Sequence, residues 1–157
     1  MLITEFLRWL HILGATVLLG TGSGIAFFML MAHRTNDPAI VAHTARYVVL
    51  ADWIFTASAV IVQPVTGSLL ALQMGWSLTE PWILLAIGLY LFVGAFWVPV
   101  VWIQKKMQTL AEEAVMANRP LPDQYFRLFN IWFVSGFPAF LAMLVIFWVM
   151  IARPQLG

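Results

Sequence analysis

The chain has 157 residues, of which 62% are hydrophobic and only 10% charged, with a net charge of +1. A typical soluble domain carries about 25% charged residues, so this composition excludes a water-facing surface of ordinary polarity. Without a basic stripe to neutralise phosphates the chain is not expected to bind nucleic acid, and without cysteine it has no disulfide, thiolate catalyst or iron–sulfur cluster.

Four apolar segments are each long enough to cross a bilayer, which takes roughly 20 residues. They predict one membrane domain, an all-α four-helix transmembrane bundle in direct contact with lipid. The first segment is longer than the apolar part of a signal peptide, so we expect it to be retained. We expect helices over about residues 6–31, 38–72, 80–117 and 124–152.

The connections carry helix-start signals. Asn36 or Asp37 before Pro38 predicts an N-cap followed by proline in the first turn. Glu80 before Pro81 predicts a similar start for the third helix. The prolines after Asn118 end that helix, and we expect Asp123 to cap the fourth.

The distribution of basic residues predicts the orientation. Two lie at the ends that carry the chain termini, Arg8 and Arg153. Cytoplasmic loops are enriched in Lys and Arg, so we expect both termini to lie outside the cytoplasm. The other six lie in or beside the two loops of the opposite side, at Arg34, Arg46, Lys105, Lys106, Arg119 and Arg127.

The first helix contains a histidine at membrane depth, His11. Its helical face continues through Gly14, Ala15, Leu18 and Gly22. Small side chains beside an imidazole leave room for a flat macrocycle, and histidine is a common axial ligand of haem iron. The first interpretation is therefore that His11 binds the iron of a haem, with Gly14, Ala15 and Gly22 against the ring.

The alternative interpretation is structural. Gly20 and Gly24 form a small-xxx-small pattern that lets helices approach closely, and His11 would then bind a neighbouring carbonyl. The same pattern predicts a homodimer. His33 and His43 lie near the cytoplasmic ends, roughly 33 Å from His11 in the case of His33. They are expected to be solvated rather than metal-bound.

The second helix has a polar stripe. Asp52, Thr56, Gln63 and Thr66 share one helical face. Polar groups in hydrocarbon should face the interior of the bundle, because lipid offers them no hydrogen-bond partner. The stripe predicts either a polar cavity with Asp52 near its cytoplasmic mouth or a network of interhelical hydrogen bonds.

In the network interpretation, basic and amide groups of other segments join the stripe. Asp52 would pair with Arg127 or Arg46, and Asn130, one turn after Arg127, would lie in the same network. Ionisable groups at membrane depth are functional candidates by default, so both interpretations make Asp52 a residue of interest.

Two short segments resemble a known family. Trp9-Leu10-His11-Ile12-Leu13, with a glycine-rich helix and His33 at its far end, resembles the HemJ-type protoporphyrinogen oxidases. The segment from Tyr125 to Asn130 resembles the start of their last helix. Over nearly its whole length the chain is more similar to an uncharacterised bacterial family of small integral membrane proteins, and more distantly to copper-resistance D membrane proteins.

The resemblance implies a bacterial inner-membrane protein that binds haem b through His11. The lysine early in the third helix and the arginine late in the first helix of the HemJ family have no counterpart here. The differences argue against protoporphyrinogen oxidation and leave haem binding with a redox or haem-linked role, for which the sequence names no electron partner. The competing hypothesis is a cofactor-free accessory subunit or small-solute handler that uses the stripe of the second helix.

Overall fold

The computed structural model describes residues 2–155 and consists of helices joined by short connections. Because α2, η1 and α3 follow one another without a break, the helices form four long rods, each apolar enough to cross a membrane. This confirms the predicted all-α four-helix bundle. The elements are α1 (Leu2–Thr35), α2 (Pro38–Ala51), the π-helical turn η1 (Asp52–Thr56), α3 (Ala57–Gln73), α4 (Pro81–Met116) and α5 (Asp123–Ala152).

The helix starts follow the sequence signals in part. The Asp37 carboxylate accepts a hydrogen bond from the Ala39 amide at 2.8 Å, as predicted for an N-cap before proline. The prediction that Asp123 caps the last helix is wrong. Pro122 has the extended backbone of the cap position, so Asp123 already lies in the first turn of α5, where no side-chain cap bond forms.

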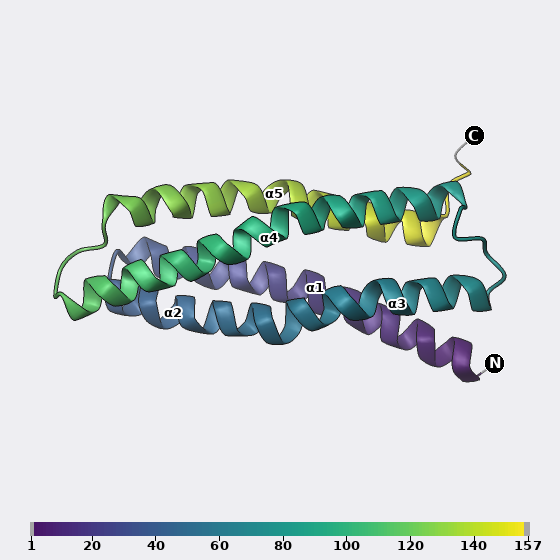
Figure 1. The fold of residues 1–157 in the computed structure, drawn as a ribbon, viewed down its shortest axis with the longest axis horizontal. Helices are drawn as coiled ribbons and strands as arrows, with labels where there is room; N and C mark the ends of the chain where they lie inside the picture. The colour runs from purple at the N-terminus through teal and green to yellow at the C-terminus, as the bar shows by residue number, and fades with distance from the viewer. Residues whose placement is uncertain (1, 156–157) are drawn as a thin grey trace.

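The four rods pack in a definite order. α4 packs along α5, α2 packs against α4, and α1 packs against both α2 and α3. Both termini lie at one end of the bundle, and the α1–α2 and α4–α5 connections lie at the other, which we call the loop end (Figure 1). The main core occupies the loop end, where Met29, Val41, Met107 and Tyr125 are almost fully buried.

Toward the end that carries the termini, the bundle divides into two pairs of helices. α1 stays against α3 and α4 stays against α5, whereas α3 has few contacts with α4 and α5. Figure 1 shows the two pairs separating from the middle of the molecule to this end. The fold is therefore a closed four-helix bundle at the loop end and two helical pairs at the other.

The outside of the molecule suits lipid. Large apolar side chains such as Phe28, Leu91 and Trp148 are more than half exposed, and others like them occur along every rod. A surface with so many exposed large apolar side chains is rare in soluble proteins. Helices of 34 and 36 residues are about 50 Å long at 1.5 Å per residue, so α1 and α4 extend beyond a hydrocarbon layer of about 30 Å. The chain is a multi-pass membrane protein.

Candidate functional site

A large cavity lies between the two helical pairs. It has a volume of about 660 Å³ and is bordered by α1, η1, α3, α4 and α5. Cavities of a few hundred Å³ with an apolar wall and a few convergent polar groups are typical of sites for small molecules. The polar side chains in its wall are Ser23, Asp52, Thr56, Tyr90, Trp97, Gln104, Trp132 and Ser135, and the other aromatic ones are Phe96, Phe133, Phe137 and Phe140.

A directed chain of hydrogen bonds ends on Asp52. The Trp132 indole N–H can only donate, so the Gln104 amide turns its oxygen toward it, with a separation of 3.1 Å. The Gln104 nitrogen then donates to Asp52 Oδ2 at 3.0 Å. Trp97 Nε1 donates to the other oxygen, Oδ1, at 3.3 Å. Both carboxyl oxygens are thus acceptors, an arrangement that suits the ionised form of Asp52.

The turn that carries Asp52 is unusual. In η1 the amide of Ala57 bonds to the carbonyl of Asp52, five residues back, which is the wide π-helical pattern. Such turns are rare and occur frequently at functional sites. Asp52 and Thr56, at the two ends of this turn, are 4% and 8% exposed and both line the cavity. Apart from Asp52 itself, Thr56 Oγ1 has no hydrogen-bond partner among residues 2–155.

The polar stripe of the second rod divides into two parts. All four of its members are buried. Asp52 and Thr56 face the cavity, whereas Gln63 and Thr66, further along in α3, contact α1 instead. The Gln63 amide donates to the backbone carbonyl of His11 at 2.9 Å, and Thr66 Oγ1 lies 3.0 Å from His11 Nδ1.

The Thr66 contact determines which nitrogen of His11 carries the proton. Thr66 Oγ1 donates its own hydrogen to the Val62 carbonyl at 2.8 Å. The hydroxyl is therefore the acceptor of the 3.0 Å contact, and His11 Nδ1–H is the donor. In this tautomer Nε2 keeps its lone pair, and between Leu2 and Gln155 it makes no hydrogen bond. A histidine that ligates a metal typically has this arrangement.

The space that the sequence predicted for a haem beside His11 is partly filled by other side chains in the structure. Gln63 fills the open side of Gly14, where an added Cβ would lie 3.2 Å from the Gln63 nitrogen. The His11 ring itself packs against Gly67 of α3. Gly22 lines the large cavity, but His11 does not. The imidazole thus suits an iron atom, whereas Gly14, Ala15 and Gly22 do not form one cradle with it in a single protomer.

The basic and amide groups predicted to join Asp52 lie elsewhere. Arg127 and Asn130 are exposed on α5. Arg46 pairs with Glu112 across α2 and α4 at 3.2 Å, with the arginine 68% exposed. Both predicted pairings of Asp52 are therefore wrong, because one exposed arginine points away on α5 and the other already has a carboxylate.

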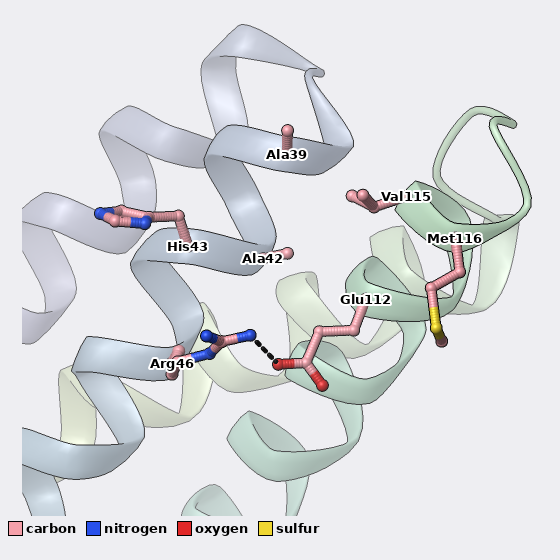
Figure 2. A pocket seen from close by; sticks show the side chains of 7 residues that line it. All are labelled: Ala39, Ala42, His43, Arg46, Glu112, Val115 and Met116. Atoms are coloured by element: carbon pink, nitrogen blue, oxygen red, sulfur yellow. Dashed lines mark hydrogen bonds and ion pairs between the residues drawn. The ribbon is translucent and has the colours of Figure 1, made fainter.

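The Arg46–Glu112 pair lines a second, smaller hollow (Figure 2). It has a volume of about 390 Å³ and lies between α2 and α4 at the loop end. Figure 2 shows the Arg46 and Glu112 side chains meeting, with His43 further along α2. Exposed ion pairs of this kind contribute little to stability, about 0–1 kcal/mol. This hollow holds no cluster of buried polar groups.

His33 is half-buried between α1 and the start of α5. Its ring stacks on Phe129 with a centroid distance of 3.5 Å, and its Nδ1 lies 3.4 Å from the Tyr125 hydroxyl. The histidine that we expected to be solvated is thus partly covered, because α1 extends past the expected residue 31 and packs against the start of α5. No group of three or more potential metal ligands from His, Cys, Asp and Glu occurs in the described part of the chain.

A family model described as "Predicted integral membrane protein (DUF2269)" matches residues 5–154. The match covers nearly the whole chain. The chain belongs to the DUF2269 family. This agrees with the predicted similarity to an uncharacterised membrane family, whereas the likeness to HemJ-type and copper-resistance D proteins stays a prediction. No curated protein and no solved structure matched the chain.

Sequence reasoning alone missed the partners of Asp52 in this DUF2269 protein. Trp97 and Gln104 are seven residues apart on α4, a spacing that places them on one helical face, so that signal was available. Trp132 carried no comparable signal, since it is one of eight tryptophans and many such residues lie at membrane interfaces. Only the packing of α5 against α4 brings its indole to Gln104.

Proposed function

We propose that this chain binds a membrane-soluble small molecule in the cavity between its two helical pairs. The observation that carries this proposal is the cavity itself. It has a volume of about 660 Å³ and a mostly apolar wall, with Asp52 at one end. The ligand is largely apolar, with a polar end directed at Asp52 and Thr56. This is the small-solute role predicted for the second helix, with the site confined to the half of the stripe near the loop end.

Filling the cavity tests the proposal. An added Cβ at Gly94 meets nothing within 4 Å, and Gly94 lines the cavity, so Gly94→Leu should occupy ligand space without a backbone clash. The neutral probe N-phenyl-1-naphthylamine should bind saturably to the protein in lipid nanodiscs, and we expect Gly94→Leu to weaken binding at least fivefold. Energy transfer from the tryptophans of the protein, two of which (Trp97 and Trp132) line the cavity, to the probe measures the binding after correction for empty nanodiscs.

The matched control is Gly88→Leu, on the same helix. Gly88 is exposed outside the cavity and also has open space around an added Cβ. Probe affinity in Gly88→Leu should equal that of the unmodified protein. Equal saturable probe binding in all three proteins would contradict the proposal, because the cavity would then not be the binding site.

A second candidate is haem b bound through His11 with a redox or haem-linked role. It is supported by one specific observation, the donation from His11 Nδ1–H to Thr66 that leaves Nε2 free. Bound haem would supply the electron-transfer chemistry, while the protein supplies the ligand and its orientation. Because no cradle forms beside His11 within one protomer, this candidate needs the macrocycle to lie outside the large cavity.

Spectroscopy of the purified protein tests the second candidate. Protein from haem-replete cells should show a Soret band that His11→Ala removes and that Thr66→Val shifts, since Thr66 orients the ring. His43→Ala, at an exposed position on α2, serves as the control and should leave the band intact. Colourless protein, or a band that survives in His11→Ala, would rule this candidate out.

The location belongs to the same proposal. The six basic residues of the loop end support an inner-membrane orientation with both termini outside the cytoplasm, and both termini do lie at one end of the bundle. The bacterial inner membrane follows from the predicted family resemblance. A homodimer through the face of Gly20 and Gly24, at which an added Cβ would meet nothing within 4 Å, stays a prediction.

A further inference from the structure

The buried carboxylate of Asp52 lacks a cationic partner. Its side chain is only 4% exposed, and every hydrogen bond that it accepts comes from a neutral group, Trp97, Gln104 or Thr56. Within residues 2–155 the one ion pair joins Arg46 to Glu112. Removing a carboxylate from water is unfavourable unless an opposite charge compensates it, so neutral donors alone leave Asp52 under-compensated.

The wall around Asp52 is rich in aromatic rings. Trp97 and Trp132 reach the carboxylate directly or through Gln104, and Phe96, Phe133 and Tyr90 line the same cavity. The faces of aromatic rings carry negative electrostatic potential and attract cations, most strongly when water is excluded. An anionic end and aromatic walls therefore favour the same kind of ligand.

Thr56 adds a second polar group to the Asp52 end of the cavity. Thr56 Oγ1 is buried and lines the cavity, and apart from the neighbouring Asp52 carboxylate it has no hydrogen-bond partner in the described chain. Asp52 and Thr56 lie at the two ends of η1, about one helical turn apart, and both line the cavity. A ligand that reaches this end meets an anion and a hydroxyl whose oxygen can still accept a hydrogen bond.

We infer that the cavity selects a lipophilic organic cation, with its positive centre against Asp52 and its apolar groups among the aromatic side chains. This inference rests on the proposed function and names the substrate class of the same site. A neutral ligand would leave the Asp52 charge uncompensated, and an anionic ligand would be repelled by it.

Two ions of the same size and shape test the inference. Tetraphenylphosphonium is a cation and tetraphenylborate an anion, so their comparison isolates the sign of the charge. Equilibrium dialysis against protein in nanodiscs, corrected for empty nanodiscs, should show saturable binding of tetraphenylphosphonium. We expect at least tenfold weaker binding of the cation to Asp52→Asn, and no saturable binding of tetraphenylborate to the unmodified protein.

Control variants separate charge from folding. Asp52→Glu keeps the charge and should retain most of the affinity, and Asp123→Asn removes an exposed carboxylate at the loop end and should change nothing. Unaltered binding of N-phenyl-1-naphthylamine to Asp52→Asn would show that its cavity is intact.

The outcomes distinguish the two proposals. If the cation binds Asp52→Asn as tightly as the unmodified protein, or if tetraphenylborate binds as well as the cation, the inference is wrong. The proposed function survives that result when the neutral probe still binds and Gly94→Leu still blocks it. If neither the neutral probe nor the cation binds saturably, the proposed function fails and the inference fails with it.

Discussion

His11 packs closely against Gly67 where α1 meets α3. A Cβ built at Gly67 would lie 2.9 Å from His11 Cε1, closer than real side chains approach. Glycine is therefore required at position 67 for the imidazole to lie flat against α3 and reach Thr66. The reciprocal contact, Gln63 against Gly14, has a flexible side chain and more room. At the scale of single residues, two glycines thus decide how closely these helices pack.

Gly67→Ala should destabilise the protein. The new methyl group forces His11 to move, and such overpacking typically costs about 1–3 kcal/mol. We expect a lower unfolding temperature in detergent than for Gly88→Ala, where the added Cβ meets nothing within 4 Å and helix propensity improves. Equal unfolding temperatures for the two variants would show that the His11 ring yields without cost.

The second rod shows how element-level signals differ in reliability. Its start is encoded locally, because Asp37 and Pro38 satisfy the cap and the first turn without help from other helices. Its π-helical turn had no signal in the sequence. Asp52 and Thr56 are four residues apart and would share one face in an ordinary α-helix as well, so their burial does not require the turn.

The cap of the second rod should contribute measurably to stability. Asp37→Ala removes the carboxylate that accepts from Ala39 and Ile40, and loss of an N-cap typically costs about 0.5–2 kcal/mol. Asp37→Asn should restore most of this. Glu80→Ala is the matched control, since Glu80 holds the cap position of α4 but forms no side-chain cap bond there. The free energy of unfolding in mixed micelles measures the effect; an equal loss in both alanine variants would contradict it.

At the scale of the whole molecule, the helices pack differently at the two ends of the bundle. The loop end contains the core that holds all four rods together, with Met29, Val41 and Met107 at its centre. The other end separates into two pairs and encloses the cavity between them. Under the proposed function, the closed end would support the site and the separated end would provide access from the membrane for an apolar ligand.

The sequence by itself determined that this protein is surrounded by lipid and that it consists of four long helical rods. Long apolar segments have one stable solution in lipid, a helix that satisfies its own backbone, and this follows from composition and length without knowledge of neighbours. It also indicated that Asp52, Thr56, Gln63 and Thr66 should turn inward.

Only the tertiary structure decided what these inward groups contact. Gln63 and Thr66 meet His11, whereas Asp52 meets Trp97 and Gln104, because contacts between helices depend on how four rods are rotated and spaced. The helical face of one segment predicts the direction in which its side chains point, but it does not predict which residues they contact. The pairing of Asp52 with Arg127 was predicted from such faces, and it was wrong for that reason.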